Sequence, residues 1–254
     1  MSEAAQIRPP SALWFLLEGR AVYEFAAGML VKPLLRLSPR GAGDPVLVLP
    51  GFLASDLSTR PLRSFLKQQG FAPHGWKLGR NLGLREGLEE GLMARLQALR
   101  RRYDRPVHLI GWSLGGIYAR DLARLAPADV RSVITLGSPF NHDPKANRSW
   151  RLFNFLSDTK VDDITPERLA EIRATPPVPT TCIFSRTDGI AHWRCCVDQE
   201  GPESENIEVE GSHLGLGVNP LVLHVIADRL AQVEGKWRPF SPNGLMRLLY
   251  RQGA

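Results

Sequence analysis

The chain has 254 residues, and its content of 43% hydrophobic and 23% charged residues is typical of a globular protein with one main domain. The net charge of +6 is spread along the chain, and its one basic run, Arg100-Arg101-Arg102, is interpreted as a solvated helix end, which argues against a nucleic-acid partner. Three cysteines do not suggest a disulfide framework and favour a reduced, cytoplasmic protein.

Residues 1–43 predict an N-terminal helical segment. The first ten residues lack the basic start and apolar core of a signal peptide. The apolar stretch from Ser11 to Leu37 is interrupted by four charged residues, Glu18, Arg20, Glu24 and Lys32. These charges break any run long enough to span a bilayer. We expect a helix packed on the domain; the alternative is peripheral membrane contact through residues 11–37.

From residue 44 onward, strand and helix patterns alternate. Strands are predicted over residues 46–49, 72–78, 106–110, 130–136, 180–184 and 207–209. Helices are predicted over residues 58–69, 86–102, 114–125 and 220–233. Such alternation predicts an α/β fold for residues 44–233, with a doubly wound, mostly parallel sheet flanked by helices.

The alternation fails over residues 141–179, where aromatic residues stand among polar ones. We expect a small, lid-like insertion over the carboxyl edge of the sheet, where ligands bind in such folds. Its Phe153 and Phe155, together with Trp112, are the candidate substrate-binding residues. The aromatic side chains of the insertion either line an acyl pocket or pack the insertion on the sheet. Residues 234–254 are expected to form a C-terminal tail.

Residues 107–118 contain the most informative motif, Gly111-Trp112-Ser113-Leu114-Gly115. An apolar strand pattern ends at this motif and a helical pattern begins at once, which is typical of a nucleophile elbow. The glycines on either side of the serine permit the close approach of strand and helix that this turn requires. The helix N-terminus adds N–H donors and positive potential where an oxyanion would form. Ser113 is therefore the candidate nucleophile.

A serine nucleophile needs a base, and histidine supplies one near neutral pH. His213 lies in a glycine-rich loop between the last predicted strand and the last helix, where the site is expected. His108 falls inside a strand and is expected in the core. The orienting acid is predicted to be Asp188, after the strand over residues 180–184, with Asp143 as the rival.

An oxyanion hole needs two backbone N–H groups aimed at the developing charge. Leu114 follows the nucleophile directly and supplies one. Phe52, in the loop after the first predicted strand, is the best-placed source of the other. Gly51 would let this backbone approach a substrate closely.

The order Ser113, Asp188, His213, with Pro50-Gly51-Phe52 upstream, resembles the α/β-hydrolase superfamily over about residues 44 to 233. Gly-Trp-Ser-Leu-Gly-Gly and Leu-Gly-Ser-Pro-Phe are similar to segments of its esterase and lipase branch. The family's common His-Gly oxyanion motif is Pro-Gly here, which leaves the N–H role of Phe52 available. A serine at the elbow argues against dehalogenases and epoxide hydrolases, which place aspartate there.

The resemblance implies hydrolysis of a small-molecule or lipid ester through an acyl-enzyme, without a metal or another cofactor. It assigns the nucleophile to Ser113, the base to His213 and the acid to Asp188, with the N–H groups of Phe52 and Leu114 as oxyanion donors. Two alternatives remain open. One is an acyltransferase, thioesterase or polyester-processing enzyme with the same triad, and the other is a non-catalytic binding protein of the same fold.

Overall fold

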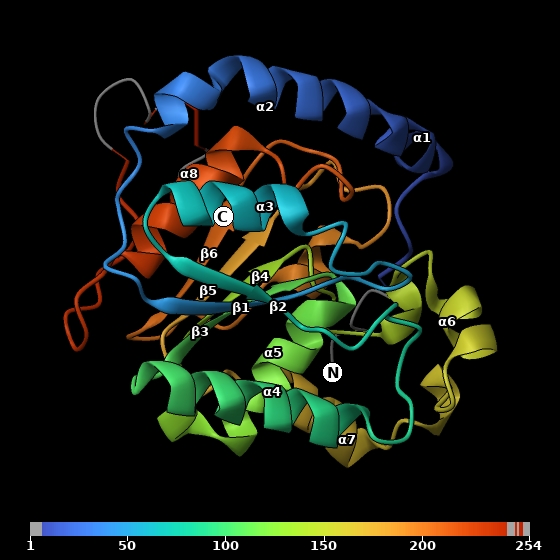
Figure 1. Ribbon diagram of the computed structural model, residues 1–254. Coiled ribbons are helices and arrows are strands. Elements are labelled where there is room, and N and C mark those ends of the chain that lie inside the picture. Colours follow the sequence, from blue (N-terminus) through green and yellow to red (C-terminus); the bar gives the residue numbers. More distant parts are fainter. Residues whose placement is uncertain (1–6, 243–246, 248, 251–254) are drawn as a thin grey trace.

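The computed structural model describes residues 7–242, 247 and 249–250, and its centre is a six-stranded sheet with helices on both faces (Figure 1). The strands are β1 (Pro45–Leu49), β2 (Ala72–Gly75), β3 (Val107–Trp112), β4 (Val130–Leu136), β5 (Thr180–Phe184) and β6 (Ser204–Glu208). Their order is β2-β1-β3-β4-β5-β6, and every neighbouring pair is parallel. The predicted doubly wound α/β fold is confirmed.

Helices α3 (Arg60–Gln68) and α8 (Pro220–Leu230) cover one face of the sheet, and α4 (Leu88–Tyr103) and α5 (Leu114–Leu125) cover the other. The alternation along β1 assigns its residues to these two layers. Val46 and Val48 join the cluster under α3 and α8, whereas Leu47 and Leu49 join the cluster over α4 and α5. Each fully buried side chain of this kind stabilises the fold by about 1.5–3 kcal/mol.

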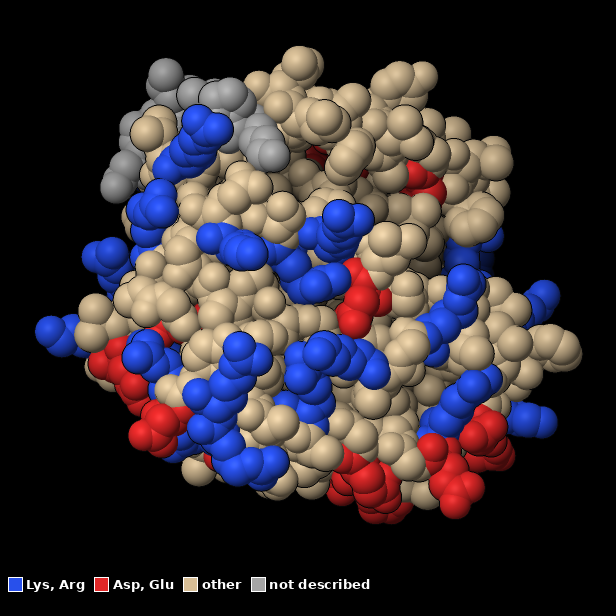
Figure 2. Space-filling view, in the orientation of Figure 1, with Lys and Arg blue, Asp and Glu red and all other residues tan. Residues whose placement is uncertain are grey.

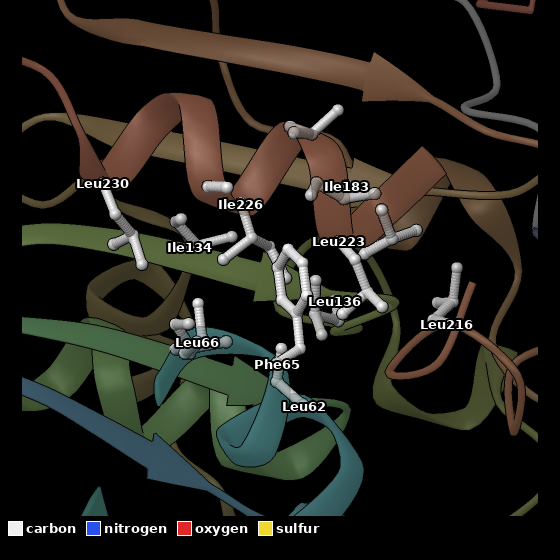
Figure 3. Close-up of a cluster of buried hydrophobic side chains, with 14 of the residues drawn as sticks. Leu62, Phe65, Leu66, Ile134, Leu136, Ile183, Leu216, Leu223, Ile226 and Leu230 are labelled. Atoms are coloured by element: carbon white, nitrogen blue, oxygen red, sulfur yellow. The ribbon is translucent and has the colours of Figure 1, made fainter. Parts of the chain in front are cut away.

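Figure 3 shows the first cluster, in which Phe65 of α3 points between the sheet and α8. Its labelled neighbours include Ile134 and Leu136 of β4, and Leu223 and Ile226 of α8. Side chains from three separate elements thus share one apolar layer, and this layer fixes α3 and α8 against the sheet.

Local sequence explains most element boundaries. Asn219 caps α8, because its side chain accepts a hydrogen bond from the N–H of Leu221, and Pro220 opens the helix. Gly70 follows α3 with a φ of +88°, a conformation that favours glycine. Strand β6 begins at Ser204, earlier than the predicted residue 207, because this edge strand starts with polar residues that show no apolar pattern.

The N-terminal segment consists of α1 (Ala12–Leu16), a 3-10 turn (Leu17–Arg20) and α2 (Ala21–Leu35), and it lies outside α3 and α8 (Figure 1). The segment approaches the domain closely at Gly28, where a Cβ would lie 3.0 Å from the carbonyl oxygen of Val218. In the structure the segment packs on α8 and on the loops that carry Asp188 and His213. Among the described helices, none combines the length and the apolar character needed to cross a membrane.

Residues 141–179 form α6 (Trp150–Leu156) and α7 (Pro166–Arg173) with two short 3-10 turns, Pro144–Ala146 and Val161–Asp163. Further 3-10 turns span Pro127–Asp129 and Trp193–Cys196. In the described part of the C-terminal tail, the hydroxyl of Tyr250 donates to the carbonyl of Leu221 at 2.9 Å. Its ring lies 4.9 Å from that of Phe240. The rest of the predicted tail, residues 243–246, 248 and 251–254, lies outside the described residues.

Candidate active site

The residues singled out as catalytic candidates all follow the carboxyl ends of strands. Phe52 follows β1, Ser113 follows β3, Asp188 lies in the loop after β5, and His213 lies in the loop after β6. Because the strands are parallel, these loops meet at one edge of the sheet, which is the edge where ligands bind in open α/β folds.

Ser113 occupies a strained turn between β3 and α5. Its φ of 52° and ψ of −122° are unfavourable for a residue with a side chain, and such strain persists only where its surroundings hold it. The N–H of Ser113 donates to the carbonyl of Leu136 at 2.8 Å, and its carbonyl accepts from Gly116 at 2.9 Å. The turn therefore holds the serine at the N-terminus of α5.

The glycines around Ser113 meet steric demands that the sequence predicted. A Cβ on Gly111 would lie 2.3 Å from the carbonyl oxygen of Gly115, and one on Gly115 would lie 2.4 Å from that of Leu49. A Cβ on Gly116 would lie 1.9 Å from the hydroxyl of Ser138. Each of these distances is too short for a real carbon contact, so β1, β3 and α5 can meet at this point only because these positions lack side chains.

Asp188 and His213 form a buried pair. His213 Nδ1 lies 2.6 Å from Asp188 Oδ2. The other carboxylate oxygen accepts from the backbone N–H groups of Ile190 and Ala191, both at 2.8 Å. This arrangement fixes the carboxylate and favours the proton of a neutral imidazole on Nδ1, which makes Nε2 the basic nitrogen.

Two opposing effects act on the pKa of His213. Burial lowers its pKa, whereas the charge of Asp188, the hydrogen bond to Asp188 and the charge of Glu18 raise it. The net result is a pKa above the ordinary value for histidine. The rival acid, Asp143, is exposed, and its side chain instead accepts from the N–H of Lys145 at 2.8 Å. Asp188 is thus the acid that contacts His213.

The end of β4 brings Ser113 and the Asp188–His213 pair together. Leu136 accepts the N–H of Ser113, and a Cβ on the next residue, Gly137, would lie 3.1 Å from both Asp188 Oδ2 and His213 Nδ1. The residue before the serine adds a second link, because Trp112 Nε1 donates to the carbonyl of His213 at 3.1 Å. Three loops that are far apart in sequence therefore converge on Leu136 and Gly137.

Trp112 is predicted to bind substrate, but it is not among the residues that line the cavity at Ser113. Its indole instead packs against the loop that carries His213, where a Cβ on Gly217 would lie 2.4 Å from the ring. The reason is the alternation along β3, which directs Trp112 toward the apolar layer of α3 and α8.

The backbone N–H groups of Phe52 and Leu114 have no hydrogen-bond partner among the described residues. Asn81 holds the loop that carries Phe52. Its carbonyl accepts from Leu53 at 2.6 Å, and its side-chain amide donates to the carbonyl of Pro50 at 2.9 Å. The sequence analysis missed Asn81, since a buried asparagine within a loop carries no local motif.

A cavity at Ser113 is lined in part by residues of α6 and α7. Its apolar lining includes Phe52, Leu84, Leu114, Ile117, Pro139, Phe140, Trp150, Phe153, Val161, Ile164, Leu169 and Ile172. The polar lining, besides Ser113, includes Asp121, His142, Asn147, Ser149 and Arg168. Phe153, a predicted substrate-binding residue, lines this cavity, and its ring lies 5.7 Å from that of Phe52. Trp150 joins it, and this favours the pocket interpretation of the insertion's aromatic residues.

Phe155 faces solvent with 82% of its surface exposed, and it is not among the residues that line this cavity. The structure therefore places Phe155, a predicted substrate-binding residue, outside this cavity. Two residues along a helix turn through about 200°, so Phe153 and Phe155 occupy opposite faces of α6.

Glu18 of the N-terminal segment is a buried carboxylate at the loops of the pair. One of its oxygens accepts from the N–H of Gly189 at 2.8 Å and from that of His213 at 3.0 Å. The other accepts from Leu214 at 3.0 Å. The sequence analysis missed this role, and the available signal was an acidic residue in an apolar stretch.

Arg20 and Glu24 add further links from the same segment. A guanidinium nitrogen of Arg20 donates to the carbonyl of Thr187 at 2.8 Å, beside Asp188. Glu24 accepts both the N–H and the hydroxyl of Ser212, at 2.8 and 2.7 Å, beside His213. The N-terminal segment thus braces both loops of the pair.

The histidine expected in the core and the thiols are poorly suited to nucleophilic catalysis. His108 lies in β3, where burial lowers its pKa to about 3, and it contacts Ser132 at 2.7 Å. All three cysteines are buried and free, and burial raises the pKa of Cys182 and Cys195 to about 12. These thiols stay protonated at neutral pH, which makes them poor nucleophiles.

No family model matches the sequence, and no curated protein matches it. Among solved structures, the chain is similar to Aspergillus fumigatus lipase B, with a TM-score of 0.56 and 17% identity over 77% of this chain and 55% of that one. It thus spans about half the length of that lipase chain. It is also similar to the mature Bacillus licheniformis lipase BlEst2, with a TM-score of 0.56 and 15% identity over 78% of this chain and 95% of that one.

A third similar structure comes from a study of the metagenome-derived lipolytic enzymes LipS and LipT. Its TM-score is 0.59 and its identity 16%, over 76% of this chain and 96% of that one. At such identities the likeness concerns the fold. The chain has the α/β-hydrolase fold, as the sequence predicted.

Proposed function

We propose that this protein is a serine hydrolase of carboxylic esters in which Ser113 is the nucleophile, His213 the base and Asp188 the orienting acid. The observation that carries the proposal is the buried Asp188–His213 pair beside a strained serine in the wall of an apolar cavity. The likeness in fold to lipases and lipolytic enzymes supports the reaction class.

In the first half of the proposed reaction, Ser113 Oγ attacks the ester carbonyl carbon and its proton passes to His213 Nε2. Asp188 accepts the Nδ1–H of the imidazolium and stabilises its positive charge. The negative charge on the former carbonyl oxygen would be held by the unpartnered N–H groups of Phe52 and Leu114. The C–O bond to the alcohol then breaks, and the alcohol leaves with the proton from His213.

In the second half, water attacks the acyl carbon while His213 takes one of its protons. The tetrahedral intermediate collapses, the proton returns to Ser113 Oγ, and the carboxylic acid is released. Each proton that His213 accepts is given up within the same half-reaction, so the enzyme returns to its initial state. In this scheme His213 carries out every proton transfer that the two half-reactions require.

The cavity indicates which part of the ester lies where. Its walls near Ser113 are largely apolar, with Phe52 and Phe153 among them. An apolar wall favours a hydrocarbon group over a charged one. We therefore assign the cavity to the acyl chain of the substrate.

The test is hydrolysis of p-nitrophenyl esters from acetate to palmitate by the full chain and by Ser113→Ala, with Ser64→Ala on the exposed side of α3 as the matched control. We expect turnover by the wild type and the control, and none above background by Ser113→Ala. A fluorophosphonate probe should label the wild type and the control and spare Ser113→Ala.

Absence of both turnover and labelling in the folded wild type would overturn the proposal and favour a binding protein. Equal turnover by Ser113→Ala would remove Ser113 from the mechanism. Competing alcohol acceptors test the remaining alternative. Labelling accompanied by transfer to alcohol and no release of free acid would identify an acyltransferase and contradict the hydrolase assignment.

A further inference from the structure

The outer surface of the N-terminal segment is unusually apolar. We call residues 12–37 the N-terminal ridge. Its exposed large apolar side chains are Leu13, Phe15, Leu16, Leu17, Val22, Tyr23, Phe25, Met29, Leu30 and Leu37. Three of them, Leu16, Tyr23 and Leu30, are 77%, 79% and 83% exposed. Figure 2 shows few charged side chains on this face over α1 and α2, whereas charges gather over the lower part of the molecule. A contiguous apolar surface of this kind marks an interaction site.

A surface helix usually turns its charged side chains to solvent and its apolar ones to the core, but this region does the reverse. Glu18 is buried and Glu24 is turned inward, and both bind the loops of the catalytic pair. Among the described side chains of residues 7–41, the exposed charged ones are Arg8, Arg36 and Arg40. The described side chains of the ridge that are exposed are therefore mainly apolar, with Arg8 before them and Arg36 and Arg40 at their C-terminal end. This arrangement is complementary to a surface that is apolar within and anionic at its boundary.

The shape of the apolar surface also bears on its partner. At 100° per residue, the exposed apolar side chains from Val22 to Leu30 cover an arc of about 160° on α2. A convex arc this broad fits a fluid medium that surrounds the helix better than it fits a flat protein face. We propose that the N-terminal ridge lies in the interface of an anionic lipid bilayer, with its apolar side chains among the acyl chains and the flanking arginines at the headgroups.

The ridge is fixed relative to the cavity. Besides the bonds of Glu18 and Glu24, Arg148 Nε donates to the carbonyl of Pro10 at 2.8 Å, and its guanidinium lies over the ring of Phe15 at 5.4 Å. Arg148 lies two residues before α6, which carries the cavity residues Trp150 and Phe153. In Figure 1, α1 and α6 lie at the same end of the molecule. Docking of the ridge would therefore hold α6 and the cavity that it lines in part at a fixed position relative to the bilayer.

The test is flotation of the full chain with vesicles of phosphatidylcholine alone or mixed with phosphatidylglycerol. The variant L16Q/L30Q replaces two exposed side chains of the ridge. The matched control, L125Q/V233Q, replaces side chains that are 54% and 64% exposed elsewhere. We expect the wild type and the control to float with the mixed vesicles and L16Q/L30Q to bind at least about tenfold more weakly.

The arginines give an independent readout. We expect R36Q/R40Q to bind the anionic vesicles about tenfold or more weakly, while its binding to phosphatidylcholine alone is unchanged. Because these are surface positions, circular dichroism and the melting temperature should match those of the wild type. None of these measurements depends on ester hydrolysis, so failure of the proposed function would leave them interpretable.

Three outcomes would overturn the proposal. One is a folded wild type that does not float with either kind of vesicle, and another is equal flotation of L16Q/L30Q and the wild type. The third is a dimer in light scattering that L16Q/L30Q dissociates, combined with no vesicle binding, which would assign the ridge to a second copy of the chain.

Discussion

Glu18→Gln is the substitution that most directly tests how the N-terminal segment supports the site. It preserves the size of the side chain and removes its charge. One carboxylate oxygen accepts from Gly189 and His213, and the other from Leu214. The amide of glutamine can replace the first oxygen, but its NH2 group would face a donor, so one backbone N–H loses its partner.

The expected loss of stability follows from the number of hydrogen bonds that Glu18 accepts. A buried N–H left without a partner costs about 1–3 kcal/mol, and the two remaining bonds become weaker because their acceptor is neutral. We therefore expect Glu18→Gln to lower the free energy of unfolding by about 2–4 kcal/mol. The charge of Glu18 also raises the pKa of His213, so its removal should lower that pKa.

The assay is the pH dependence of kcat/KM for a p-nitrophenyl ester, measured beside urea unfolding. Because the base must be neutral, activity rises as pH passes upward through the pKa of His213. For Glu18→Gln we expect this acid limb to shift to lower pH. Glu24→Gln is the matched control, since Glu24 binds the neighbouring Ser212 but is not among the charges that raise this pKa.

Glu24→Gln should lower stability and leave the acid limb in place. If Glu18→Gln loses stability but keeps the wild-type pH profile, Glu18 is a structural residue only and the electrostatic reasoning is refuted. An unchanged free energy of unfolding would refute the count of lost hydrogen bonds.

Three further predictions concern the turn, the pair and a buried ion pair. Gly115→Ala should lower the free energy of unfolding in urea by about 3 kcal/mol, because the new Cβ would lie 2.4 Å from a backbone oxygen of β1. Asp188→Asn should lower kcat about 10⁴-fold and move the acid limb of kcat/KM to lower pH, because Asp188 orients His213 and raises its pKa. Arg120→Met should destabilise the fold by about 3–5 kcal/mol, measured in the same way, because it leaves the buried carboxylate of Asp198, now 2.5 Å from the guanidinium, without its partner.

Two of these predictions have matched controls. Gly19→Ala meets no atom within 4 Å and should change stability little, so an equal loss at both glycines would contradict the steric argument. Arg100→Met removes two exposed or partly exposed ion pairs, with Asp104 and Asp129, and should cost less than about 1 kcal/mol. For Asp188→Asn, wild-type kcat would show that the pair is not part of the mechanism.

The sequence was sufficient for the parts of this protein that depend on local chemistry. The glycines around Ser113 identified the elbow because no side chain fits between β1, β3 and α5. The alternating strand and helix patterns predicted the sheet because buried parallel strands are apolar on both faces, as β1 is. His213 and Asp188 were found from chain order, since each lies in a loop that follows a late strand.

The roles that sequence reasoning missed or misassigned depend on contacts between distant segments. Asn81 lies 31 residues from the proline whose carbonyl it binds, and it belongs to no local motif. Phe155 and Trp112 are candidate substrate-binding residues from the sequence, but helix and strand geometry directs them elsewhere. Composition does not specify the face of an element on which a side chain lies.

The choice between Asp188 and Asp143 also depends on contacts between distant segments. Both follow strands that end at the same edge of the sheet, so chain order allows either acid to approach His213. Only the tertiary structure places one carboxylate 2.6 Å from the imidazole and the other at a turn in solvent. The local sequence around the charged residues of the N-terminal segment indicated even less about which groups they bind. Glu18 interrupts an apolar stretch, and it becomes a buried acceptor for the loops of the pair only because folding brings together residues more than 170 positions apart in the chain.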